Sequence, residues 1–122
     1  MRPHGRRDHR KLRAFELADR LVLEVYKLTR TFPREELFGL TAQIRRSSLS
    51  IASNIVEGCA RHSEADYVRF LDIAYASARE LEYQLSIAER LGYLKSYEYE
   101  EISSLCIETS RVLNGLLRAL RK

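Results

Sequence analysis

Helix-breaking residues are scarce in this chain of 122 amino acids, which has only two prolines and five glycines. The chain is rich in leucine, alanine, glutamate and arginine, which favour helix. With only two cysteines and no CxxC string, neither a disulfide framework nor a zinc site is expected. No apolar run approaches the roughly 18 residues of a membrane-spanning helix. The basic N-terminus lacks the apolar segment of a secretory signal, so we expect a cytoplasmic protein without a membrane contact.

Catalytic motifs are missing as well. The chain contains no Walker A string and no glycine-rich dinucleotide fingerprint, and no Glu-x-x-His pair of the kind that binds iron in helical bundles. Cys59 and Cys106 are isolated and are expected to be small apolar core residues. The sequence therefore predicts a protein that is not an enzyme, with no cofactor and no metal. An acid–base role for Asn54 and Glu57 is the weaker alternative.

Charge is distributed unevenly along the chain, whose net charge is +4. Residues 1–13 have a net charge of +5 and residues 111–122 of +4, whereas residues 63–110 have −6 and residues 14–62 have +1. The basic residues are therefore concentrated at the two ends, around a neutral to acidic centre.

Apolar residues at helical spacing predict four helices, over about residues 11–31, 40–60, 63–91 and 96–120. Pro33 ends the first helix, since the residue before a proline avoids the α region. Ser63 and Asp66 resemble a capping box for the third helix. Gly92 is placed to terminate that helix, and Ser96 is expected to cap the fourth. Because all three connections are short, we expect an all-α, antiparallel up-down-up-down four-helix bundle.

Each predicted helix has an apolar stripe that would face the core. In the first helix this stripe comprises Phe15, Ala18, Val22, Val25 and Thr29, and Leu21, Leu28 and Phe32 widen it. In the second helix it comprises Leu40, Ile44, Ser48, Ile51, Ile55 and Cys59. The third helix contributes Tyr67, Phe70, Leu71, Ala74, Ala78, Leu81, Leu85 and Ala88. The fourth contributes Ile102, Leu105, Thr109, Val112, Leu113, Leu116 and Leu120.

A second, polar stripe follows the second helix. We expect its residues to form a helix-packing or subunit interface, and they are Gln43, Ser50, Asn54 and Glu57. Their spacing alternates four and three, which keeps them on one face. Small serines also make this helix thin, so that another backbone can approach closely. A plain solvated face is the alternative.

Clustered basic residues are the electrostatic footprint of nucleic-acid binding. The up-down topology would bring both chain ends and the end of the second helix to one pole. We predict a flexible basic tail over residues 1–10, before a bundle over residues 11–122. The candidate nucleic-acid contacts are Arg6, Arg7, Arg10, Lys11, Arg13, Arg45, Arg46 and Arg61. Tyrosines 67, 75 and 83 could stack on bases, although packing against neighbouring helices is the better interpretation.

A long string in the middle of the chain resembles a known family. Its matching residues are Phe32-Pro33, Glu36, Gly39-Leu40, Gln43-Ile44-Arg45-Arg46, Ser50-Ile51, Ser53-Asn54-Ile55, Glu57-Gly58 and Arg61. This pattern resembles the 23S rRNA-intervening-sequence proteins, also called S23 ribosomal proteins, and the resemblance extends from about Leu12 to Leu120. Phe15 stands where that family often has Trp. Ala52 stands where it often has Pro, so the second helix should be straighter.

The resemblance implies an up-down four-helix bundle that assembles into a homopentamer. The family is similar to the accessory variability protein of diversity-generating retroelements, a basic pentamer that binds nucleic acid and partners a reverse transcriptase. The leading interpretation is thus a non-enzymatic homo-oligomeric scaffold that binds RNA or DNA. The alternative is a protein-interaction subunit, for example a partner of a reverse transcriptase, with no direct nucleic-acid role.

Overall fold

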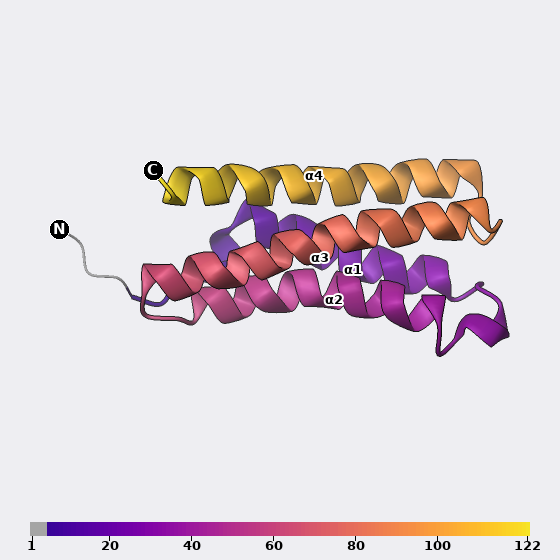
Figure 1. Cartoon of the computed structure of the whole chain (residues 1–122), viewed down its shortest axis with the longest axis horizontal. Helices are drawn as coiled ribbons and strands as arrows, with labels where there is room; N and C mark the ends of the chain where they lie inside the picture. Colours follow the sequence, from indigo (N-terminus) through magenta and orange to yellow (C-terminus); the bar gives the residue numbers. More distant parts are fainter. Residues whose placement is uncertain (1–4) are drawn as a thin grey trace.

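The long axis of the molecule is set by a bundle of antiparallel helices (Figure 1). The computed structural model describes residues 5–122, and within that range four α-helices are present. They are α1 (Arg13–Thr29), α2 (Leu40–Cys59), α3 (Glu64–Arg90) and α4 (Ser96–Leu120). Two short 3-10 helices precede α1 and α2, namely η1 (His9–Lys11) and η2 (Arg34–Glu36). The predicted all-α four-helix bundle is confirmed.

Each helix packs against its neighbours in the chain, and α1 also packs against α4, which closes the ring of four. The short α2–α3 connection lies at the same end of the bundle as the C-terminus and the start of the described chain (Figure 1). The α1–α2 and α3–α4 connections lie at the opposite end. We call the first end the terminal pole. The up-down-up-down topology therefore brings both basic ends of the chain together.

The core follows the predicted stripes most closely in α3, where all eight predicted residues are buried. In α2, Ile44, Ser48, Ile51, Ile55 and Cys59 are buried as predicted. In α1, Leu21 is buried as predicted, but the stripe needs a correction, because Phe15 and Val22 are only partly buried, whereas Leu17, which was not predicted, is almost fully enclosed. The helix is rotated toward these leucines, since α1 must face α2 and α4 together.

Close approach of α2 to α3 depends on small residues. Ser47 and Ser48 are fully buried. A Cβ placed on Gly58 would lie 3.0 Å from Cβ of Phe70 and 3.3 Å from the carbonyl oxygen of Tyr67. These distances are tighter than an ordinary van der Waals contact, so the glycine is required by packing. The thin second helix expected from the sequence is thus used for contact within one chain.

The predicted capping and terminating residues lie at the helix ends, with one exception. The Ser63 hydroxyl oxygen accepts a hydrogen bond from the Asp66 backbone N–H at 3.1 Å, and Gly92 has a positive φ of 81°, as the sequence predicts. Ser96 is not the cap of α4, because the helix already begins at that residue. Lys95 occupies the capping position, where its backbone N–H donates to Glu98 Oε1 at 2.9 Å.

Neither cysteine is on the surface, as the sequence predicts. Cys59 and Cys106 are free thiols with 1% and 0% of their surfaces exposed. Within residues 5–122, no helix combines the length and apolar character needed to cross a membrane.

The buried thiol of Cys106 gives a pH dependence that can be measured. Burial raises its pKa from 9.0 to about 12, so the folded chain holds this proton more tightly than the unfolded chain. Its contribution to stability is complete below about pH 9 and is lost as the pH rises toward 12. In urea titrations, we expect the free energy of unfolding to fall between about pH 9 and pH 11. The Cys106→Ala variant should show a shallower fall, and equal slopes for both proteins would contradict this.

Candidate nucleic-acid interface

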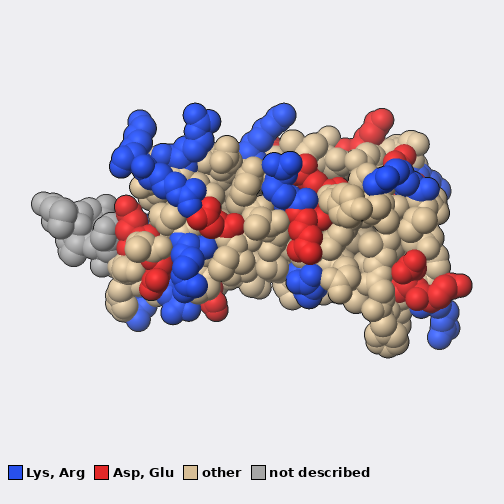
Figure 2. Space-filling view, in the orientation of Figure 1, with Lys and Arg blue, Asp and Glu red and all other residues tan. Residues whose placement is uncertain are grey.

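Lys and Arg side chains are densest over the part of the bundle that ends in the terminal pole, with Asp and Glu interspersed among them (Figure 2). The helices at this pole position them in two ways. The first two turns of α3 supply aromatic rings on which guanidinium groups lie. The last turns of α4 supply cations and no acid, which is favourable near the negative end of a helix dipole.

Arg7 contacts the bundle rather than extending from it. Its backbone N–H donates to the Cys59 carbonyl at 2.7 Å, and its guanidinium lies 3.9 Å from the Tyr67 ring centroid. Arg7 Nη2 also lies 3.3 Å from Glu64 Oε1. The sequence predicts a flexible tail over residues 1–10. Its first four residues lie outside the described range, and flexibility of the remainder stays a prediction, although Arg7 contacts the bundle.

Arg61 and Arg69 share one aromatic ring. The two guanidinium carbons lie 4.6 and 5.0 Å from the centroid of Phe70. Arg61 lies 3.9 Å from Glu57, its neighbour one turn away, and Arg69 lies 4.0 Å from Asp66. Both ion pairs are at the outer limit of contact and are largely exposed, so each contributes little. Stacking on Phe70 is therefore the main contact of both guanidinium groups, and Arg61 Nε is buried without a hydrogen-bond partner among the described residues.

The other predicted contacts near the N-terminus differ in their pairing. Arg10 donates two side-chain hydrogen bonds to Asp8, at 2.9 and 3.1 Å, which lower the pKa of that carboxyl. Arg13 bonds to Glu16 at 3.2 Å and to Glu108 at 3.0 Å. Arg6 and Lys11 are exposed and form no ion pair within residues 5–122. Arg6 and Lys11 are thus the most available of this group.

Two of the candidate contacts, Arg45 and Arg46, lie away from the terminal pole and from Arg61. They lie in the first two turns of α2, about 22 Å along the helix from Arg61. Arg45 Nε donates to Thr29 Oγ1 at 2.8 Å, which ties α2 to α1. Arg46 is 3.6 Å from Glu80 of α3. These two arginines therefore link α2 to its neighbouring helices. They lie far from the terminal pole because α2 begins at the opposite end of the bundle.

The polar stripe of α2 is divided between two roles. Ser50 lies toward α3, where the Ser50 and Ser77 hydroxyls are 2.9 Å apart. The Asn54 amide donates to the Ser50 carbonyl at 2.8 Å. Gln43 instead accepts two bonds from Arg46, and Glu57 pairs with Arg61. Asn54 and Glu57 therefore make separate contacts rather than forming one acid–base pair.

Basic residues near the C-terminus were missed as candidate contacts. Arg111, Arg118 and Lys122 are exposed and have no ion-pair partner in the described part of the chain. Arg121 is different, since it pairs with Asp72 of α3. The signal was present in the sequence as four basic residues and no acid over residues 111–122. The number of clustered basic residues favoured the N-terminal segment as the binding site, because it contains more of them than the C-terminal segment.

The fold and this surface define a class of protein, a four-helix bundle with a basic pole formed around its chain termini. A family model described as 23S rRNA-intervening sequence protein matches residues 10–115. The chain belongs to this family, and the resemblance seen in the sequence is confirmed.

A solved structure supports the same assignment. It is a protein with unknown function from the S23 ribosomal protein family of Bacteroides thetaiotaomicron, 28% identical to this chain. The match has a TM-score of 0.80 and covers 86% of this chain and 95% of the other. A comparison with curated proteins finds no significant match. Neither the family nor the solved relative indicates an enzyme. Across residues 5–122, no group of three or more His, Cys, Asp or Glu side chains could hold a metal ion.

Proposed function

We propose that this protein is a non-enzymatic, homo-oligomeric scaffold that binds the RNA or DNA backbone through its terminal pole. One observation carries the proposal: the fold brings two basic chain ends together, and Arg111, Arg118 and Lys122 have no ion-pair partner among residues 5–122. Unpaired guanidinium and ammonium groups release counterions from phosphates without first breaking a protein ion pair. Arg6 and Lys11 add to the same surface.

Aromatic rings at the pole support a contact with the nucleic-acid backbone more than with bases. Tyr67 and Phe70 are buried, with 1% and 9% of their surfaces exposed. Their faces are also occupied by Arg7, Arg61 and Arg69. Neither of these two rings is therefore free to stack on a base. Phosphate contacts position a nucleic acid but do not read its sequence, so we expect binding with little sequence preference.

Self-association is supported by apolar side chains that a single chain leaves exposed. On α1, Leu23 and Tyr26 are 66% and 39% exposed, and on α2, Leu49 and Val56 are 47% and 36% exposed. Burial of such side chains is a common source of stability in homo-oligomers. A ring of subunits, pentameric by the family resemblance, would also place several basic poles side by side. Several phosphate-binding poles acting together would then raise the overall affinity.

Salt dependence of RNA binding tests this proposal. We expect the chain to bind a labelled single-stranded RNA at low salt, with log affinity falling linearly against log salt concentration. The three C-terminal cations of one subunit contribute about −2 to the slope, and further cations of the pole or further subunits make it steeper. Fluorescence anisotropy across a salt series measures it. No binding by micromolar protein at low salt overturns the nucleic-acid function, and a light-scattering mass equal to the chain mass of 14.2 kDa overturns the scaffold.

A further inference from the structure

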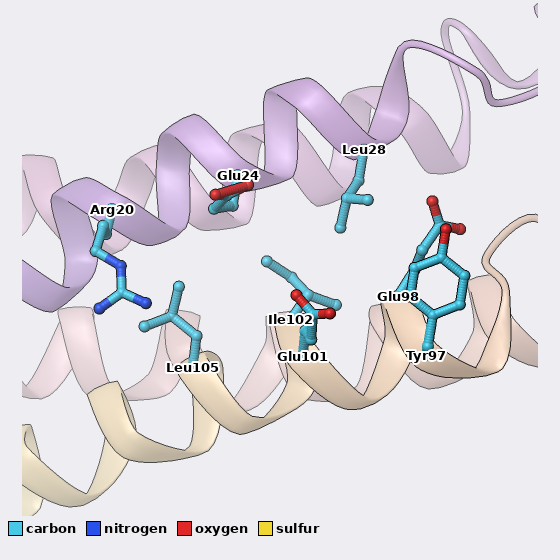
Figure 3. A pocket seen from close by; sticks show the side chains of 8 residues that line it. All are labelled: Arg20, Glu24, Leu28, Tyr97, Glu98, Glu101, Ile102 and Leu105. Carbon is cyan, nitrogen blue, oxygen red and sulfur yellow. The ribbon is translucent and has the colours of Figure 1, made fainter.

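A groove between α1 and α4 has chemistry opposite to that of the terminal pole (Figure 3). Its apolar part is formed by Leu28, Ile102 and Leu105, which point into the space between the two helices. Ile102 and Leu105 are almost fully buried, with 2% and 7% exposed. The volume of this hollow is about 200 Å³. The apolar floor is therefore narrow, and half-buried Leu28 is its most exposed part.

Carboxylates form the rim of this groove. Glu24 comes from α1, and Glu98 and Glu101 come from α4, while Arg20 is the one cation among the residues that line it. Glu98 is held by the Lys95 backbone N–H. Glu24 lies 3.9 Å from Lys27 on its own helix, which is a weak exposed pair. Glu101 has no ion pair within residues 5–122. The rim thus has a net negative charge that the chain itself leaves largely uncompensated.

The groove continues along α4 into a shallower hollow. This second hollow shares Arg20, Tyr97, Glu101 and Leu105 with the first and extends to Glu108. The distance from Tyr97 to Glu108 along a helix is roughly 16 Å, or about three turns. A surface of this length matches a short helix better than a small molecule, because the hollow of about 200 Å³ continues into a shallow one of about 500 Å³ instead of forming one enclosed pocket.

We propose that the α1/α4 groove is a docking site for a short amphipathic helix of a partner protein that carries lysine or arginine beside an apolar stripe. Charge complementarity selects this occupant. The carboxylate rim repels nucleic acid and anionic lipid, whereas basic side chains of the partner would pair with Glu24 and Glu101. Apolar residues of the partner would pack on Leu28 and Ile102, in the manner of helix-in-groove recognition. The exposed Tyr97 ring offers a further face for a cation.

This inference goes beyond the proposed function, because the groove lies on the side of the bundle and excludes the ligand of the terminal pole. The protein would then hold a nucleic acid at one end and a basic protein along α1 and α4. The two sites use separate residues, so each can be removed without removing the other.

Peptide binding to the intact chain tests the groove. The probe is a labelled synthetic peptide of about four helical turns with a leucine stripe flanked by lysines. One comparison peptide has every lysine replaced by glutamate. A second comparison peptide keeps the composition but scrambles the stripe. We expect micromolar binding of the first peptide alone. The Glu24→Gln/Glu101→Gln variant should bind it about fivefold to tenfold more weakly, as expected for the loss of two rim charges.

The matched control is Asp19→Asn/Glu35→Gln, which removes the same charge from exposed positions outside the groove. It should change the affinity less than twofold, and both variants should keep the circular dichroism spectrum and RNA affinity of the wild type. Equal binding of the scrambled peptide, or equal loss in both variants, overturns the proposal. A groove variant that lowers the oligomeric mass without affecting the peptide also overturns it, because a second copy would then be the occupant.

Discussion

Replacing Arg111, Arg118 and Lys122 together with glutamine is expected to lower the affinity for single-stranded RNA about tenfold to hundredfold at low salt. These side chains form no ion pair within residues 5–122, so the wild-type protein can use all three for phosphate contacts. Each lost contact should reduce the slope of log affinity against log salt by about 0.7. The slope of the variant should therefore be shallower by about 2, as measured by fluorescence anisotropy across a salt series.

A matched control separates position from total charge. Arg30→Gln, Arg34→Gln and Lys95→Gln remove the same three charges at the opposite end of the bundle, where these exposed residues also lack ion pairs within the described chain. This control should keep most of the affinity and slope. If both triple variants lose affinity equally, RNA binding reflects net charge, and the terminal pole is not the site.

Truncating Leu81 to alanine is expected to cost about 2 to 5 kcal/mol of unfolding free energy. Leu81 is fully enclosed in the core cluster on α3, where the facing helices cannot collapse around a cavity without moving. A loss of this size is a large share of the total stability of a small domain. Urea denaturation monitored by circular dichroism measures it.

Leu91→Ala is the control for that measurement. Leu91 follows the last residue of the same helix and is 54% exposed. Its truncation should cost less than about 1 kcal/mol, since most of its surface already contacts water. Equal losses at the two positions would mean that α3 does not bury the face assigned to it.

Local sequence signals were enough for the helices because they depend on neighbouring residues. Pro33, Ser63 and Gly92 act within one helical turn, and the apolar period of α3 needs no knowledge of the other helices. Ser96 shows the limit of such signals. The same turn contains Glu98, whose carboxylate accepts the N–H of Lys95 and moves the cap by one residue.

The candidate interface was only partly predictable, because a basic residue is available to a ligand only if the fold leaves it without a partner. Arg7 meets Glu64 and Arg13 meets Glu108 across sequence separations of 57 and 95 residues. Charge counts along the chain contain no information about such pairs. They did identify a basic C-terminal segment, and the structure shows which members of it remain unpaired.

By itself, the sequence determined the number and order of the helices, their antiparallel arrangement, the buried thiols and the family. These follow from short-range periodicity, short connections and a long specific string of residues. Only the tertiary structure decided that Arg45 links helices, that Arg7 docks on Tyr67, and that the Ser50 hydroxyl meets Ser77. It also placed an acidic groove between α1 and α4. The physical reason is that helix formation is local, whereas pairing and surface shape depend on how whole helices pack.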